Sequence, residues 1–381
     1  MSVNIYDVAV VGAGISGLAA ASRLQHGRKR VVVLESSDEV GGRAATSRIN
    51  LPPNAGVLVD YGTQCFTAHS PRFREQVERW EERGICFPWT DGLWKWKQGV
   101  LSAPDPLFKQ RHYACRNGMK QLGRNLAEGV EVILEYHVAS VELIMGIWHI
   151  HPACSQSTHT PVMARMLFVS TPLPVAFKLL GQHLFASEEC GLMGRIAYEP
   201  TITVVGIYPE GITPPPWQAI EVDNHDSQIF RIAWDSSRRK RGSHGAVAVV
   251  HAVETFSNPW LEPSAEALRR TGQELLVEAS KLAGDWMKDH FDLAVHRWRY
   301  GRSVGPRASM GFVKGPGCSP LYIVGDGLNG GMIEGAWLSG TFAAEDCLHK
   351  KRQLGFLQSD IAGHRSTNRT SVAEKEKLLI P

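Results

Sequence analysis

The chain has 381 residues, of which 43% are hydrophobic and 21% charged, and its formal net charge is +3. This composition is ordinary for a globular protein, and the length predicts two domains that each bury a core. So slight a charge does not indicate nucleic-acid binding, and no apolar run approaches the length of a membrane span.

Seven cysteines are scattered along the chain without a C-x-x-C pair, and their odd number predicts reduced thiols in a cytoplasmic protein. The apolar N-terminus lacks the basic region of a signal peptide. His149 and His151 alternate on one predicted strand with no third ligand nearby, so we expect no metal site.

The first 35 residues carry a complete βαβ pattern. The apolar run Val8–Val11 predicts a buried strand, residues 18–21 predict a helix, and Val31–Leu34 predicts a second strand that ends on Glu35. Three glycines follow the first strand in the spacing G-x-G-x-x-G: Gly12, Gly14 and Gly17. This arrangement is the dinucleotide-binding fingerprint.

Each part of this fingerprint has a mechanical role. The first glycine permits the tight turn, the second lets the backbone approach a pyrophosphate, and the third lets the helix lie close to the sheet. The helix N-terminus at Ile15 and Ser16 offers N–H groups and partial positive charge to phosphates. Glu35 can accept hydrogen bonds from ribose hydroxyls and would repel a 2′-phosphate, which disfavours NADP.

The residues after Glu35 distinguish FAD from NAD. Residues 34–43 read Leu-Glu-Ser-Ser-Asp-Glu-Val-Gly-Gly-Arg, which resembles the Leu-Glu-Ala-x-x-x-x-Gly-Gly-Arg pattern of the flavin-containing amine oxidase superfamily. In that family the paired glycines let the backbone pass under the cofactor, and the arginine reaches its phosphates or ring. The resemblance implies FAD as the cofactor, with Gly42 and Arg43 in contact with it.

A second string narrows the resemblance. Residues 60–67 read Asp-Tyr-Gly-Thr-Gln-Cys-Phe-Thr, similar to the Asp-x-Gly-Ala-Gln-Tyr-hydrophobic-Thr string of the renalase branch, and depart from it at Thr63 and Cys65. The resemblance implies that Gln64 and Cys65 lie beside the isoalloxazine, and Phe66 is a candidate for the substrate pocket. Cys65 is either a small buried side chain or a redox group.

Helical periodicity predicts a helix over residues 70–83, with Phe73, Val77 and Trp80 on its buried face. Residues 87–96 predict a hairpin around a Thr-Asp-Gly turn, whose tryptophans either pack or line a pocket.

Further elements follow along the chain. They are a helix over 120–127, strands over 129–135, 138–143, 147–151, 166–169, 201–208, 229–234 and 246–251, and a helix over 265–282. In the amine oxidase family the valine that matches Val138 contacts the adenine, and the hydrophobic run that ends at Thr171-Pro172 is the crossover between domains. The basic run Arg238–Arg241 predicts a solvated loop, with phosphate binding as the alternative.

A second cofactor signature stands near residue 326. The buried run Leu321–Val324 leads into Gly-Asp-Gly and then a helix rich in small residues. In flavoproteins of this type the aspartate, here Asp326, accepts hydrogen bonds from the ribityl chain, and the helix N-terminus stabilises negative charge on the reduced ring. The resemblance implies further cofactor contacts from Gly331, Met332 and Ile333. No cysteine stands where monoamine oxidases attach their flavin, so we expect non-covalent FAD.

The string His296–Tyr300 is close to the Arg-Trp-Arg string of renalase-like proteins. Trp298 is either a wall of the substrate pocket or a core residue, and Asn329 is a further pocket candidate.

We therefore expect an α/β fold, in which a Rossmann-like FAD-binding domain of the glutathione-reductase and amine-oxidase type is interleaved with a mixed-sheet α+β substrate domain. The predicted FAD domain comprises residues 1–67, 112–172 and 300–348. The predicted substrate domain comprises 68–111 and 173–299, and 349–381 form a polar tail.

The expected activity is hydride transfer from a small-molecule substrate to flavin N5, with O2 as the acceptor. The resemblance to renalases implies isomeric dihydro forms of NAD(P) as the substrate. An amine or amino-acid oxidase of the same superfamily is one alternative, and a non-catalytic flavin-binding protein is the other. We expect neither nucleic acid nor a membrane as a partner, and the sequence identifies no catalytic residue.

Overall fold

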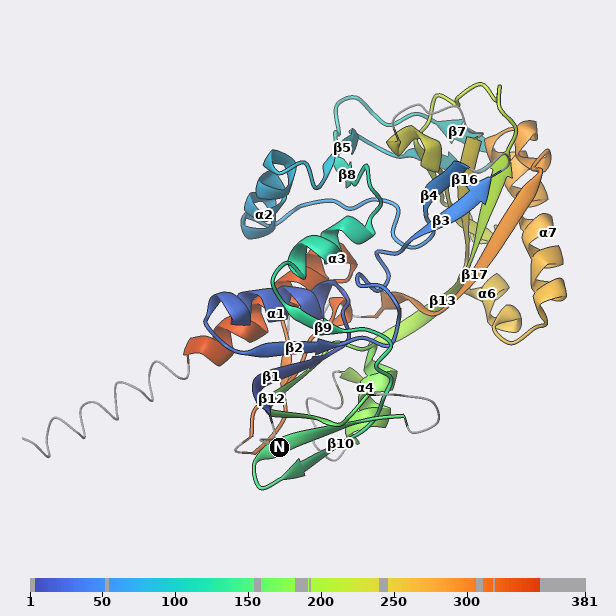
Figure 1. Ribbon diagram of the computed structural model, residues 1–381. Coiled ribbons are helices and arrows are strands. Elements are labelled where there is room, and N and C mark those ends of the chain that lie inside the picture. Colours follow the sequence, from blue (N-terminus) through green and yellow to red (C-terminus); the bar gives the residue numbers. More distant parts are fainter. Residues whose placement is uncertain are drawn as a thin grey trace, which may run out of the picture.

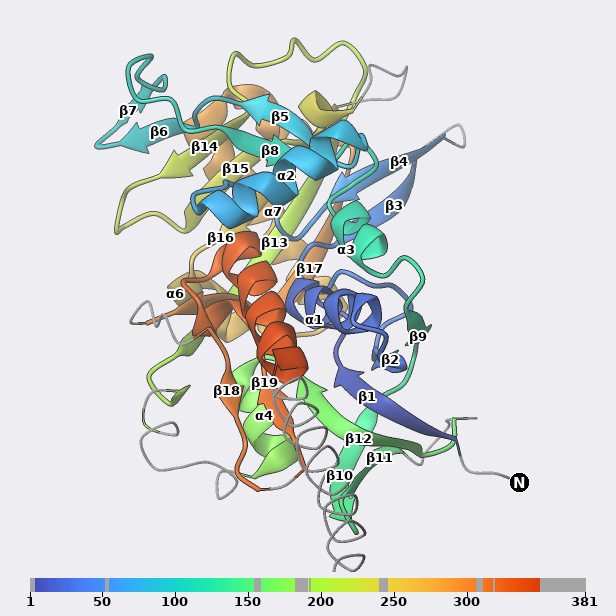
Figure 2. The same ribbon diagram turned by 90° about the vertical axis from the view of Figure 1, so that its left-hand side faces the viewer.

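The computed structural model describes residues 4–51, 55–153, 159–181, 191, 193–239, 246–305, 311–317 and 319–349. Residues 350–381 of the predicted tail and three of the cysteines, Cys154, Cys190 and Cys318, lie outside these ranges. Two lobes make up the described chain, one built on an eight-stranded sheet and the other on a seven-stranded sheet (Figures 1 and 2).

The first lobe has a parallel sheet at its centre, in the order β9-β2-β1-β12-β19. Its strands are β1 (Ile5–Val11), β2 (Val31–Leu34), β9 (Glu131–Ile133), β12 (Val162–Val169) and β19 (Leu321–Ile323). The outer edge of β12 is shared, because β11 pairs with its first half and β19 with its last three residues. Three antiparallel strands complete the sheet: β10 (Val138–Ile144), β11 (Ile147–Pro152) and β18 (Val313–Lys314).

Helices cover both faces of this sheet, which explains its almost continuous apolar strands. On one face α1 (Ile15–His26) and the helix over 332–349 pack over β1 and β12, and α3 (Lys120–Leu126) lies beside α1 (Figure 2). The opposite face carries α4 (Leu173–Leu180) and a second core. The predicted βαβ unit is confirmed.

The second lobe is a sheet in the order β17-β13-β16-β15-β14-β6-β7, antiparallel except where β14 meets β6. Its strands are β6 (Trp94–Lys97), β7 (Val100–Ser102), β13 (Ala197–Tyr208), β14 (Ala219–Val222), β15 (Ile229–Trp234), β16 (Ala246–Ala252) and β17 (Asp292–Val304). One face is covered by α7 (Ala265–Ala283), whose leucines pack on the strands. The long pair β13 and β17 reaches from this lobe toward the first (Figure 1).

Shorter elements connect or flank the lobes. They are β3 (Thr46–Leu51), β4 (Ala55–Asp60), α2 (Pro71–Glu82), β5 (Phe87–Thr90), β8 (His112–Ala114), α6 (Glu254–Ser257) and the 3-10 turns η2 (Asp235–Arg238), η3 (Asn258–Trp260), η4 (Asp285–Lys288) and η5 (Asp326–Leu328). The helix predicted over 70–83 is confirmed, with Ser70 as its N-cap and Phe73, Val77 and Trp80 buried.

The packing of α2 and β4 crosses the predicted domain boundaries. The buried face of α2 joins the core of the first lobe, whereas Val59 of β4 packs against the second sheet. The division into an FAD domain and a substrate domain at the stated residues stays a prediction.

The predicted hairpin over residues 87–96 is wrong. β5 pairs with β8, and β6 pairs with β7 through a two-residue turn at Gln98 and Gly99. Both turn residues have positive φ, 50° and 83°, which is the combination that a type I′ hairpin turn requires. Trp94 and Trp96 are partly buried against the core of the second lobe, as the packing alternative expects.

Candidate cofactor-binding site

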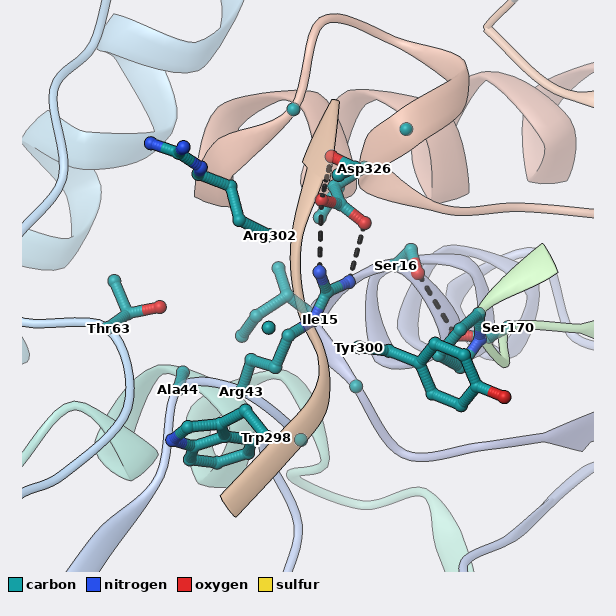
Figure 3. Close-up of a pocket in the computed structure, with 18 of the residues that line it drawn as sticks. Ile15, Ser16, Arg43, Ala44, Thr63, Ser170, Trp298, Tyr300, Arg302 and Asp326 are labelled. Atoms are coloured by element: carbon teal, nitrogen blue, oxygen red, sulfur yellow. Dashed lines mark hydrogen bonds and ion pairs between the residues drawn. The ribbon is translucent and has the colours of Figure 1, made fainter. Parts of the chain in front are cut away.

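A cavity of about 780 Å³ lies between the two lobes and is lined by residues of both. The carboxyl ends of four parallel strands open into it, so that Gly12 follows β1, Glu35 follows β2, Ser170 follows β12 and Asp326 comes shortly after β19. Ligands of open α/β sheets bind at this edge. Figure 3 shows part of the lining.

The first glycine turn holds α1 close to the sheet. A Cβ on Gly17 would stand 2.2 Å from the carbonyl oxygen of Gly12, so no larger residue fits at that position. Ser16 Oγ lies 3.0 Å from Ser170 Oγ, which joins the start of α1 to the end of β12 (Figure 3). A Cβ on Gly14 would meet only Ser170 Oγ, at 4.0 Å, so this backbone is open to the cavity.

Glu35 is fixed by backbone N–H groups. Its Oε2 accepts a hydrogen bond from Ala13 N at 2.6 Å, and its Oε1 accepts one from Ser37 N at 2.9 Å. The side chain is buried but lines the cavity. The Ser36 hydroxyl also donates to Oε1, at 3.2 Å. A carboxylate has about four lone-pair sites, so these three bonds leave one site for a ligand hydroxyl.

An ion pair joins the two glycine-rich segments across the cavity. Arg43 Nη2 lies 2.5 Å from Asp326 Oδ1, and Ser303 Oγ donates to Asp326 Oδ2 at 2.7 Å (Figure 3). Burial alone would raise the pKa of Asp326, but the Arg43 guanidinium and the Ser303 hydroxyl hold this pKa below its usual value. The carboxylate is therefore ionised at neutral pH.

The second glycine-rich segment presents a helix N-terminus. Gly331 N donates to the carbonyl oxygen of Asp326 at 2.8 Å, and Gly325 N donates to Ser339 Oγ at 3.0 Å. Gly330 and Gly331 have φ values of +81° and +80°, which favour glycine, and Met332 follows at +64°. The first N–H groups of the helix over 332–349 thus lie at the cavity, where they favour negative charge.

The second lobe contributes a wall of side chains from the edge strand β17. Trp298 stacks on Tyr61, with ring centroids 5.4 Å apart, and the ring of His296 lies 4.3 Å from that of Trp298. Trp298 Nε1 donates to the carbonyl oxygen of Tyr61 at 3.3 Å. Burial, and then the charge of Arg297, lower the pKa of His296, so its imidazole is neutral at pH 7.

Most of the predicted site residues line this cavity. They are Gly12, Gly14, Ile15, Ser16, Glu35, Gly42, Arg43, Thr171, Trp298, Asp326, Gly331, Met332 and Ile333. Trp298 lies on the wall rather than in a core, although its role toward a substrate stays a prediction, as do the contacts of all these residues with FAD.

Six predicted site residues lie outside the lining: Gly17, Gln64, Cys65, Phe66, Val138 and Asn329. Gly17 acts through the packing of α1. Phe66 is buried against the rings of Phe73, Trp80 and Tyr113, and Val138 packs on the core beneath the sheet. Cofactor or substrate contacts by Val138, Asn329, Gln64, Cys65 and Phe66 therefore stay predictions.

Gln64 and Cys65 follow Thr63 in the chain, and both are buried, whereas Thr63 lines the cavity. The Cys65 side chain is a free thiol, and burial raises its pKa. A thiol that burial keeps protonated is a poor nucleophile. This favours the interpretation of Cys65 as a small buried side chain over that of a redox group.

Sequence reasoning missed part of the wall. The lining also includes Tyr61, Thr63, Ser170, His296, Tyr300, Arg302 and Ser303. Strand alternation would not have found them, because the cavity is lined by the unbroken run from Trp298 to Gly305, within which the register of β17 against β13 shifts.

The prediction of a solvated basic loop at 238–241 is wrong for its first two residues. Arg238 is fully buried and pairs with Asp60 and Asp235, and Arg239 pairs with Asp60. These carboxylates supply the partners that burial of a guanidinium requires. Lys240 and Arg241 lie outside the described residues.

No group of three or more His, Cys, Asp or Glu side chains in the described ranges could hold a metal ion. None of the helices found there combines the length and the apolar composition that crossing a bilayer demands.

Comparison with known proteins points to one family. Residues 81–348 match the model of the flavin containing amine oxidoreductases, and residues 10–80 match that of an NAD(P)-binding Rossmann-like domain. The chain is 36% identical over 76 residues to (S)-6-hydroxynicotine oxidase of Paenarthrobacter nicotinovorans, a match that covers 20% of the chain and 18% of the relative. It is 58% identical over 45 residues to flavin-containing amine oxidase B of Homo sapiens, covering 12% of the chain and 9% of the relative.

The matched segments thus span less than a fifth of these curated relatives. Among solved structures, cyclohexylamine oxidase from Brevibacterium oxydans superposes with a TM-score of 0.66 at 15% identity. That superposition covers 92% of this chain and all of the other. At so low an identity the likeness shows the fold.

Proposed function

This chain belongs to the flavin-containing amine oxidoreductase family, whose model matches more than half of its residues, and on that premise we propose that it is an FAD-dependent oxidase of a small amine-type substrate. A bound FAD would supply the two-electron acceptor for a hydride from a substrate carbon, with O2 as the final acceptor. The chain's own residues hold the cofactor, orient the substrate and exclude water.

The residues present fit FAD. Gly14 leaves its backbone open to a pyrophosphate, and Glu35 retains one acceptor site for a ribose hydroxyl. Thr171 Oγ1 is buried on the lining with no hydrogen-bond partner in the described part of the chain, and a bound ligand would satisfy it. A volume of 780 Å³ lies within the range of cofactor sites.

The observation that carries the proposal is the meeting of both glycine-rich segments at one cavity. Glu35 and Asp326, nearly 300 residues apart in the sequence, line the same space, and Arg43 bridges to Asp326 at 2.5 Å. A dinucleotide that reaches from the ribose-binding carboxylate to the second helix N-terminus would contact both segments. A strand-turn-helix unit that only packs in the core would not require a second glycine-rich segment at the same cavity.

The wall opposite these segments would orient the substrate. Tyr61 and Trp298 present stacked aromatic faces, and the neutral imidazole of His296 lies beside them. Such faces bind flat or apolar groups and exclude water. Hydride loss from an electron-rich substrate needs little acid–base help, so no general base is assigned.

A second candidate is renalase-like oxidation of isomeric dihydro forms of NAD(P). Two observations favour it: the renalase-like string at residues 60–67, and the stacked rings of Tyr61 and Trp298, which suit a planar pyridine ring. The amine substrate has the support of the family match and of the relatives named above.

Anaerobic mixing distinguishes these candidates. The purified protein should be yellow, and its colour should leave with acid precipitation if FAD is bound non-covalently. Bleaching of the flavin by members of an amine panel would support the first candidate, and bleaching by 6-dihydro-NAD alone would support the second. A flavin that neither panel bleaches would contradict both and leave a non-catalytic flavin-binding protein.

A further inference from the structure

A buried charged cluster lies behind the cavity wall and takes no part in the proposed chemistry. It consists of Asp60, Asp235, Arg238 and Arg239, here called the Asp60–Arg238 cluster. Arg238 Nη1 lies 3.0 Å from Asp60 Oδ2, and Arg238 Nη2 lies 2.7 Å from Asp235 Oδ1. The side chains of Asp60, Asp235 and Arg238 have no solvent exposure.

Arg238 and Arg239 both pair with Asp60, but their other acceptors differ. Arg239 donates to the backbone oxygens of Leu58, Cys115 and Arg116, whereas Arg238 binds Gln64. Arg238 Nη1 donates to the backbone oxygen of Gln64 at 2.7 Å, and Nη2 donates to its side-chain Oε1. Gln64 Nε2 in turn donates to the backbone oxygen of Asp60. One guanidinium therefore holds both ends of the segment 60–64, here called the clamped segment.

The other side of the clamped segment faces the cavity. Tyr61 and Thr63 line it, and Thr63 N donates to the backbone oxygen of Arg43 at 2.9 Å. A Cβ on Gly62 would stand 2.1 Å from that same oxygen, so the segment packs directly on the residue that pairs with Asp326. A displacement of the clamped segment would move Tyr61, Thr63 and Arg43 together.

Stability alone is a poor reason for such a cluster. Removing two carboxylates and two guanidiniums from water is costly, and well-packed apolar residues often replace buried ion pairs without loss of stability. A planar guanidinium can bind a carboxylate and an amide in one fixed geometry, which a lysine cannot. The hydrogen-bond geometry thus fits a role in fixing one conformation of the clamped segment.

We propose that Arg238 is a positioning residue, which fixes the clamped segment so that Tyr61 and Thr63 face the cofactor cavity in a single arrangement. The inference rests on the proposed function only in that the cavity holds the flavin. Arg238 touches neither the cavity nor a reacting atom and acts through Gln64.

Arg238→Lys tests this role, and Arg239→Lys is the matched control. Both substitutions retain a positive charge near Asp60. Arg239→Lys removes bonds to backbone oxygens outside the clamped segment, and only Arg238→Lys removes the bonds to Gln64. In the full-length protein, hydrogen exchange of the amides of residues 61–65 should become about 10-fold faster in Arg238→Lys and change little in Arg239→Lys. The visible absorption maximum of the bound flavin should shift in Arg238→Lys alone.

Equal exchange rates and equal spectra in the two variants would overturn the inference. If Arg238→Lys does not accumulate as folded protein, Gln64→Met removes the side-chain acceptor at similar volume and should give faster exchange at residues 61–65; unchanged exchange would again overturn it. The exchange measurement requires no turnover. An Arg238-specific effect in a protein whose flavin no substrate bleaches would therefore refute the proposed function and leave the inference standing.

Discussion

The two walls of the cavity are built in different ways. The first lobe presents mainly backbone: glycine turns, helix N-termini and strand ends, with Glu35 and Asp326 held by fixed partners. The second lobe presents side chains from the edge strand β17, among them those of His296, Trp298 and Tyr300. The backbone wall suits a constant group such as a dinucleotide, whereas the side-chain wall is where a substrate can be selected.

The two walls also differ in how deeply their strands are buried. Residues 8–11 of β1 are all buried, so a change there disturbs the core of the sheet. Along β17 most residues are half-buried or exposed, so they can be exchanged at little cost to the fold. We therefore expect mutations of the first wall to affect folding and cofactor retention, and mutations of the second to affect substrate use.

The largest expected effect is at Gly17. In Gly17→Ala the new methyl group meets the carbonyl oxygen of Gly12 at 2.2 Å and Ser170 Oγ at 2.8 Å, so α1 must move. We expect a loss of about 3 kcal/mol in the free energy of unfolding, measured in urea. Gly14→Ala is the control, because its methyl group points into the cavity: it should fold normally and lose FAD. Equal stability of the two variants would mean that Gly17 is not needed to pack α1 against the first wall.

Glu35→Gln should weaken cofactor retention without unfolding the protein. The amide keeps one acceptor oxygen, but its NH2 group takes the place of the other and cannot accept a hydrogen bond. One of the two bonds, from Ala13 N or from Ser37 N, is therefore lost. We expect the Kd for FAD to rise about 10- to 100-fold, as for loss of a hydrogen bond to a charged group. Dialysis followed by the ratio of flavin to protein measures this. An unchanged ratio of flavin to protein would mean that Glu35 does not contribute to cofactor binding.

Asp326→Asn should lower the free energy of unfolding by an amount that depends on pH. Because the pKa of Asp326 is depressed in the folded state, its ionised form stabilises the protein fully above the unfolded pKa, about 3.9. This contribution is lost as the pH falls through the folded value. The variant should therefore be less stable than the wild type by about 1–2 kcal/mol at pH 7 and by progressively less below about pH 4.

Urea unfolding of both proteins from pH 7 to pH 3 measures this difference. A gap in stability that does not narrow at low pH would mean that the carboxylate charge contributes nothing and that the substitution acts through packing.

The smallest expected effect is at Trp298. Trp298→Phe keeps an aromatic face but loses ring area and the bond to Tyr61. We expect KM for the identified substrate to rise about 3- to 5-fold, with little change in bound FAD. Steady-state kinetics and flavin content measured on one preparation separate the two. Loss of FAD with an unchanged KM would assign Trp298 to the cofactor and blur the distinction between the walls.

The first wall was readable because its signals are local. The run Val8–Val11, the three glycines and Glu35 lie within one βαβ unit, and chain connectivity alone places them together. The apolar run before Asp326 predicted a strand, and the family pattern predicted that this segment binds the same cofactor as the first motif. Packing periodicity likewise gave α2, because Phe73, Val77 and Trp80 are spaced for one helix face.

The second wall was not readable, because its members meet only in three dimensions. The rings of Tyr61 and His296 meet edge to face although more than 200 residues separate them. The burial of Arg238 depends on Asp60, whose sequence surroundings contain no sign of a distant partner. The hairpin at 87–96 failed for a related reason: β5 takes its partner β8 from beyond the β6–β7 turn.

The shared edge of β12 has a consequence for synthesis on the ribosome. β11 directly precedes β12 in the chain, whereas β19 leaves the ribosome only after the whole second lobe. A nascent chain can form the early half of the sheet but keeps the end of β12 without its outer neighbour until residue 321 emerges. Until then this open edge is a place where another chain can pair, so interrupted translation should yield aggregates rather than a half-sized flavoprotein.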